Sequence, residues 1–268
     1  MLLRQVEYAR AASVDEALAL LASSPDARPL AGGQTLVNVM KARIASPDLL
    51  VDLNDLPELR EIRETDAGLE LGSMVTCSQL MLAPEVHRVR PILADVTAQI
   101  ADVQVRNRGT IGGNLCSNDP TNHLPPLVTA LRASMTVVGP RGEREVPATD
   151  FFLGVYMTAV APGELLTRIT VPRRGEGDGF ASVTIGREGT CIASAAAGLN
   201  GSLRVALGCV SAAPVVVEPA STEEGAVREA VRSASLDPPS DVHASADYRR
   251  HLAEVLAVRA ARQAGGGS

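Results

Sequence analysis

Two short segments, each with a Gly-Gly pair, place the strongest limits on how this chain folds. The first reads AGGQT, from Ala31 to Thr35, and the second reads TIGGN, from Thr110 to Asn114. Glycine permits backbone conformations that a Cβ atom would block, and it lets a ligand approach the main chain. Successive free N–H groups in such a loop form a concavity suited to phosphate oxygens. The segments therefore predict either two ordinary tight turns or two loops that hold opposite sides of one phosphate-bearing ligand.

Several other functional classes lack their sequence signals in this chain. There is no G-x-G-x-x-G with an acidic residue about twenty positions on, as a doubly wound nicotinamide dehydrogenase would need, and no Gly-Lys-Ser/Thr of a P-loop. The four histidines are scattered and no nucleophile elbow is present, which disfavours a hydrolase or transferase. The acidic net charge of −6 and an aromatic content of 2% argue against nucleic-acid binding.

Composition limits the kind of hydrophobic core that the chain can form and the cellular compartment that we expect for it. Apolar residues make up 46% of the chain, so a sizeable and mainly aliphatic core can form. The cysteines are far apart and form no C-x-x-C pair, so we expect no metal site in this chain: Cys77, Cys116, Cys191 and Cys209. No signal-peptide pattern or membrane-spanning apolar run is present, which predicts a cytoplasmic protein with reduced thiols and no transmembrane segment.

The order of strand and helix signals predicts a mixed fold. Capping boxes at Ser13 and Thr76 predict helix starts, and Pro125-Pro126 suits the first turn of another helix. Ile92, Val96 and Ile100 share one helical face, so we expect one helix that leads directly to TIGGN. Apolar segments bounded by turn residues predict an edge strand within 1–12, strands at 49–53 and 69–74, and a hairpin over 135–147. Beyond the polar loop 173–179 we expect an antiparallel sheet from 180–185, 192–199 and 203–210, then helices over 222–234 and 248–264.

Four longer stretches carry a resemblance to a known family. They read PLAGGQTLVNVMKARIASPDLLVDL, RNRGTIGGNLCSNDPTNHLPP, FFLGVYMTAVAPGELLTRITVP and HASADYRRHLAEVL. Together they resemble the FAD-binding (medium) subunit of molybdenum hydroxylases, the carbon monoxide dehydrogenase medium-subunit and xanthine dehydrogenase flavin-domain type. The resemblance covers about residues 2–263, and the order and spacing of the two glycine segments are its most specific part.

The resemblance implies an α+β fold and a site for FAD. The expected architecture is a two-subdomain FAD-binding fold of the vanillyl-alcohol oxidase/PCMH type (1–54 and 55–172), followed by a small C-terminal α/β domain with an antiparallel sheet (173–268). The glycine segments would wrap the FAD pyrophosphate and ribityl chain, while Leu165 or Leu166 would offer the flavin ring an apolar face. The implied cofactor-binding residues are Leu30, Ala31, Gly32, Gly33, Gln34, Thr35, Leu36, Ile100, Thr110, Gly112, Gly113, Asn114, Asp119, His123, Leu165 and Leu166.

Some positions depart from the family pattern or allow two roles. His123 stands where the family often has Asp, and it would either bond a ligand hydroxyl or be a surface or buried histidine. Asp119 would orient the flavin ring or belong to a structural turn. Phe180 or Arg187 would replace a family residue that contacts the flavin, and Cys191 has no assigned role.

The family's function is electron transfer, and the resemblance implies the same here. Electrons would pass from a molybdopterin-binding large subunit through iron–sulfur clusters of a small subunit to this FAD. The FAD would then reduce an external acceptor such as NAD or a quinone. The cofactor would carry the chemistry, so no side chain is expected to be a catalytic acid or base. The alternative is a flavin-fold scaffold or assembly subunit without its own redox role.

Overall fold

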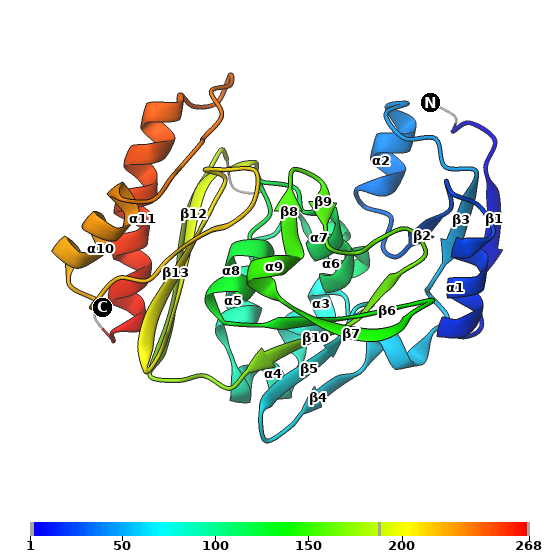
Figure 1. The fold of residues 1–268 in the computed structure, drawn as a ribbon, viewed down its shortest axis with the longest axis horizontal. Helices are drawn as coiled ribbons and strands as arrows, with labels where there is room; N and C mark the ends of the chain where they lie inside the picture. Colours follow the sequence, from blue (N-terminus) through cyan, green and yellow to red (C-terminus); the bar gives the residue numbers. More distant parts are fainter. Residues whose placement is uncertain (1–2, 187–188, 267–268) are drawn as a thin grey trace.

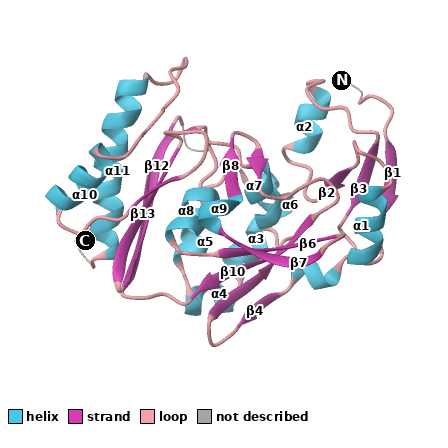
Figure 2. Ribbon diagram, viewed as in Figure 1, coloured by secondary structure: helices cyan, strands magenta, loops and turns pink. Residues whose placement is uncertain are grey.

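Three β-sheets follow one another along the long axis of the molecule, and each contributes to a hydrophobic core (Figures 1 and 2). The computed structural model describes residues 3–186 and 189–266. A small two-stranded ribbon lies above the second sheet in the view of Figure 1. Among the described residues, no helix combines the length and apolar character needed to cross a membrane.

The first sheet is parallel, with strand order β1-β3-β2, so the expected N-terminal edge strand is confirmed. The Ser13 hydroxyl accepts from the Glu16 N–H at 3.1 Å and starts α1, while the Glu16 carboxylate bonds the Ala12 N–H at 2.8 Å. Because the strands are parallel, their carboxyl ends meet at one edge, and the AGGQT segment leaves β2 there. The elements are β1 (Glu7–Arg10), α1 (Val14–Ala22), β2 (Arg28–Leu30), α2 (Leu36–Lys41) and β3 (Leu49–Asp52).

The second sheet is antiparallel, with order β4-β5-β10-β6-β7, and helices pack on it to enclose the largest core. Leu71 and Ile169 of the sheet share this core with Leu80, Leu115 and Leu127 of the helices. The strands are β4 (Ile62–Glu64), β5 (Gly68–Gly72), β6 (Ser134–Gly139), β7 (Gly142–Pro147) and β10 (Leu165–Pro172), with the ribbon β8 (Phe152–Gly154) and β9 (Met157–Thr158). The helices are the 3₁₀-helix η1 (Pro57–Arg60), α3 (Cys77–Leu82), α4 (Pro84–Val89), α5 (Ile92–Thr97), α6 (Val103–Arg108), α7 (Ile111–Ser117), α8 (Leu124–Ala130) and α9 (Ala148–Phe151).

The prediction of one helix through Ile100 is wrong. Helix α5 ends at Thr97, Ala101 takes a left-handed φ of 42°, and a separate helix α6 follows. The Asp102 carboxylate starts α6 by accepting from the Val105 N–H at 2.8 Å. An Asp before a short helix is a recognised start signal, and it interrupts the apolar periodicity that suggested a continuous helix.

The third sheet is antiparallel, with order β11-β12-β13-β14, and is covered by α8 on one face and by α10 and α11 on the other (Figure 1). A Cβ at Gly179 would lie 2.0 Å from the Ala260 carbonyl oxygen, so α11 sits close enough to exclude larger residues. This explains the Ala- and Gly-rich strands. The predicted three-stranded sheet and two helices are confirmed, and one further strand, β14, is added. The bounds are β11 (Gly177–Thr184), β12 (Cys191–Asn200), β13 (Ser202–Gly208), β14 (Val215–Val217), α10 (Glu224–Arg232) and α11 (Ala246–Ala264).

Candidate functional site

The two glycine segments lie against each other in the folded chain. A Cβ atom at Gly32 would lie only 2.0 Å from the carbonyl oxygen of Arg108 and 3.0 Å from the Cα atom of Gly109. A Cβ atom at Gly113 would lie 3.8 Å from that of Ala31. The first glycine of AGGQT is therefore required for the close approach of the chain leading into TIGGN.

The AGGQT segment presents open backbone donors. None of the N–H groups from Gly32 to Thr35 has a hydrogen-bond acceptor within the described part of the chain. Gly33 has a left-handed φ of 72°, a conformation that occurs in the backbone nests that bind anions. Leu30 ends β2 just before this segment, and Leu36 begins α2 just after it. Four adjacent unpaired donors at the carboxyl edge of a parallel sheet suit the oxygens of a phosphate group.

The expectation that TIGGN is a loop with free N–H groups is wrong. These residues form the first turn of α7 (Ile111–Ser117). The Gly112 N–H donates to the Ser73 carbonyl at 2.9 Å, and the Gly113 N–H donates to the Thr110 hydroxyl at 3.0 Å. A Cβ at Gly112 would lie 2.6 Å from that Ser73 oxygen, so Gly112 is needed for packing within the protein.

The side chain of Asn114 adds an acceptor to the site. Its Oδ1 atom is buried without a hydrogen-bond partner among the described residues. Its backbone carbonyl accepts from the Asn122 side chain at 3.1 Å, so the residue is held in place. A buried, unpaired amide oxygen is costly unless a donor reaches it, and the hydroxyl of a ligand would meet that need.

Three apolar residues expected near a flavin ring lie mainly inside the protein. Leu165 and Leu166 are adjacent on β10, with 3% and 4% of their surface exposed, and pack into two different cores. Ile100 is half-buried against the second sheet's core. Little of either leucine is open to a ligand in this structure, and their contact with the ring stays a prediction.

Asp119 belongs to a hydrogen-bonded turn. Its Oδ1 atom accepts from the Thr121 N–H at 2.9 Å and from the Thr121 hydroxyl at 2.8 Å, and its Oδ2 atom accepts from the Tyr156 hydroxyl at 3.0 Å. The preceding Asn118 has a left-handed φ of 38°, and its side chain donates to the Gly154 carbonyl at 2.7 Å. Both carboxylate oxygens are thus partnered, which favours the structural role over orientation of a ring.

His123 is buried against Phe180, with ring centroids 5.3 Å apart, so Phe180 also lies in the core. The Nε2 atom of His123 has no partner among the described residues. Burial lowers the pKa of His123, and a hydrogen bond with the Thr121 backbone partly opposes this shift. The ring is therefore neutral at pH 7. Arg187, the other residue expected to contact the flavin, lies outside the described residues.

We expect replacement of His123 by glutamine to flatten the pH dependence of stability. The unfolded chain takes up a proton at this histidine at about pH 6.5, whereas the folded chain takes it up only at a lower pH. The contribution of His123 to the free energy of unfolding is therefore complete above the unfolded pKa and is lost as the pH falls through the folded pKa. Urea unfolding at several pH values should show a shallower fall in His123→Gln than in the wild type. Replacing the exposed His251 provides the control, and an equally steep fall in both variants would contradict the assignment.

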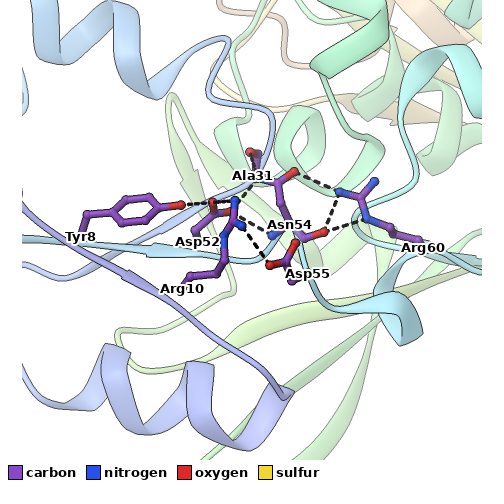
Figure 3. Close-up of polar contacts among 7 residues, drawn as sticks. All are labelled: Tyr8, Arg10, Ala31, Asp52, Asn54, Asp55 and Arg60. Atoms are coloured by element: carbon purple, nitrogen blue, oxygen red, sulfur yellow. Dashed lines mark hydrogen bonds and ion pairs between the residues drawn. The ribbon is translucent and has the colours of Figure 1, made fainter.

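Sequence reasoning missed the residues whose hydrogen bonds hold the start of the AGGQT segment. The side chain of Asn54 donates to the Ala31 carbonyl at 3.2 Å and to Asp52, the last residue of β3, at 2.6 Å (Figure 3). The available signal was Asp52, which is the last residue of the buried strand β3. This signal can be recognised only when β3 is known to pair with β2, the strand that leads into AGGQT.

The chain is similar to known proteins along nearly its whole length. Residues 4–174 match the family model described as the FAD binding domain in molybdopterin dehydrogenase. The chain is 36% identical to the carbon monoxide dehydrogenase medium chain of Afipia carboxidovorans, with 96% of each chain covered. It is 33% identical to the glyceraldehyde dehydrogenase medium chain of Sulfolobus acidocaldarius, covering 97% of this chain and 98% of that one. A solved structure of reconstituted CO dehydrogenase from Oligotropha carboxidovorans matches with a TM-score of 0.94 and 34% identity over 100% of both chains.

The family model spans more than half of the chain, and the curated relatives extend the match to nearly its full length. The cofactor of this family is FAD, and the relatives are components of oxidoreductases. The open N–H groups of AGGQT and the unpaired Asn114 oxygen offer the donors and the acceptor that the phosphates and hydroxyls of FAD require. The chain therefore belongs to the family of FAD-binding medium subunits of molybdenum-dependent dehydrogenases.

Proposed function

We propose that the AGGQT segment binds the diphosphate of FAD and that this chain relays electrons through the flavin. The observation that carries the proposal is the run of four N–H groups from Gly32 to Thr35 that find no acceptor among the described residues and lie next to the chain that enters α7. Backbone donors bind phosphate oxygens without a basic side chain. The Asn114 amide oxygen, which is buried without a partner among the described residues, would accept from a ribityl hydroxyl.

FAD, when bound, supplies the redox chemistry, and the protein supplies binding, orientation and electrostatics. We propose that electrons reach it from iron–sulfur clusters in a small partner subunit, fed by a molybdopterin-binding large subunit. The relatives support this organisation, because they are named medium chains of dehydrogenases. The external acceptor would be NAD, a quinone or another carrier. We keep the division into 1–54, 55–172 and 173–268, and the cytoplasmic location, as predictions.

The visible spectrum of the purified chain tests the proposed function. We expect one FAD per chain, identified by chromatography of the released chromophore, because the diphosphate donors and ribityl acceptor lie within this chain. Mixing the loaded chain with a reduced iron–sulfur partner subunit should bleach the flavin absorbance. A flavin that stays oxidised beside reduced clusters would instead favour the scaffold function. A chain that takes up no FAD, alone or within its complex, would contradict the site.

A further inference from the structure

The direction of the Gly32 N–H group depends on the Ala31 carbonyl, which is fixed by a hydrogen bond within the protein. The Ala31 carbonyl and the Gly32 N–H belong to one planar peptide unit, so they point in opposite directions. The Ala31 carbonyl accepts a hydrogen bond from the Asn54 side chain at 3.2 Å (Figure 3). This bond therefore directs the Gly32 N–H away from Asn54.

Every polar atom of the Asn54 side chain is used inside the protein. Its Nδ2 atom also donates to the Asp52 carboxylate at 2.6 Å, and its Oδ1 atom accepts from the Arg60 guanidinium at 3.0 Å. The same guanidinium donates to the Asn54 backbone carbonyl at 3.1 and 3.2 Å. Rotation of the Asn54 amide would break bonds on both sides, so the side chain has one orientation.

The Asp52 carboxylate is committed to this network. Asp52 is only 4% exposed, and its Oδ1 atom accepts from both the backbone and the side chain of Asn54, at 2.9 and 2.6 Å. Its Oδ2 atom accepts from the Tyr8 hydroxyl and lies 3.5 Å from the Arg10 guanidinium (Figure 3). Burial raises the pKa of Asp52, but the hydrogen bonds from Tyr8 and Asn54 outweigh burial and lower it. The ionised carboxylate therefore faces protein groups and is not aimed at a ligand.

We infer that Asn54 is a positioning residue for the FAD diphosphate, which acts by fixing the Ala31–Gly32 peptide, and that Asp52 and Tyr8 hold Asn54 in its working orientation. The inference rests on the proposed placement of the diphosphate on AGGQT. Strand β1 supplies Tyr8, the end of β3 and the turn after it supply Asp52 and Asn54, and the 3₁₀-helix η1 supplies Arg60. The open N–H groups are then arranged before the cofactor arrives, which reduces the ordering cost of binding.

The variant Asn54→Ala tests this inference in the full chain. We expect its FAD dissociation constant to rise by about tenfold, the usual effect of losing one well-placed hydrogen bond. The phosphorus NMR resonances of FAD bound at saturation should also shift, because the diphosphate donors are reoriented. The matched control is Asn200→Ala, which removes an exposed asparagine at the end of β12 and should leave both measurements unchanged.

The variant Tyr8→Phe keeps the inference testable if Asn54→Ala folds poorly. It removes one hydroxyl from a half-exposed side chain, and we expect a rise in the FAD dissociation constant of about threefold, because Tyr8 acts only through Asp52. Wild-type FAD affinity in Asn54→Ala, or weaker affinity with unchanged phosphorus resonances, would overturn the positioning role. If Gly32→Ala binds FAD like the wild type, the placement of the diphosphate on AGGQT fails instead, so the two failures are distinguishable.

Discussion

Replacing Gly32 with alanine should weaken FAD binding by about a hundredfold, because overpacking of this kind costs roughly 3 kcal/mol. The new Cβ atom would lie 2.0 Å from the Arg108 carbonyl oxygen and 2.6 Å from its carbon, and both are backbone atoms that cannot rotate away. The two glycine segments would have to separate, and the N–H groups of AGGQT would move with them. Titration of apoprotein with FAD, followed by flavin fluorescence, measures the effect.

The matched control is Gly225→Ala, in helix α10. A Cβ there meets no heavy atom within 4 Å, and alanine favours a helix over glycine. This variant should bind FAD like the wild type and unfold at the same temperature or slightly above it. If Gly32→Ala binds FAD as tightly as Gly225→Ala, the contact between the two segments does not shape the site, and the placement of the diphosphate on AGGQT fails. A thermal unfolding scan of both apoproteins separates loss of the site from loss of the fold.

The second large effect is expected at the buried ion pair between Arg90 and Asp178, which joins the second sheet's helices to the first strand of the third sheet. The Arg90 guanidinium bonds both Asp178 oxygens, at 2.9 and 2.6 Å, and the carbonyls of Pro172 and Arg173, each at 2.7 Å. Both charged side chains are almost fully buried, at 2% and 3% exposed. Arg90→Met would leave the Asp178 carboxylate buried without a counter-charge, so the free energy of unfolding in urea should fall by about 3–5 kcal/mol.

Two further variants test the cause of that loss. The control is the pair of the exposed Arg63 and the partly buried Glu70, and Arg63→Met should cost less than about 1 kcal/mol. Removing both buried charges, in Arg90→Met combined with Asp178→Leu, should recover much of the stability, since no unpaired charge remains. A single Arg90→Met variant as stable as Arg63→Met would show that the pair does not hold the third sheet against the rest of the chain.

Local sequence patterns were sufficient to predict an element wherever the interactions that form it lie within a few residues of each other. A hydroxyl three residues before a helical N–H caps α1 and α3, and the predicted capping box at Thr76 is complete. Pro57 begins a short helix, and the turn at 139–142 closes the β6–β7 hairpin. The family resemblance also depends on such segments, because the two glycine motifs are read directly from the sequence.

Contacts between residues far apart in the sequence determined the features that local patterns did not predict. The glycines of TIGGN look like a loop in isolation, but the Ser73 carbonyl and the Thr110 hydroxyl bind their N–H groups in a helix. Leu165 and Leu166 are both apolar, so the sequence could not show which of them a ligand would reach; their strand lies in the middle of a sheet with cores on both sides.

Motifs and periodicity act over a few residues, so they were enough to predict the family, its cofactor and most of the helices and strands. Which N–H groups of AGGQT are left without a partner among the described residues depends instead on tertiary contacts. That outcome depends on which groups folding brings near: Asn54 reaches Ala31 from 23 positions away, and Arg108, the last residue of α6, lies against Gly32. No local pattern encodes those distances, because hydrogen bonds form wherever folding places donor beside acceptor.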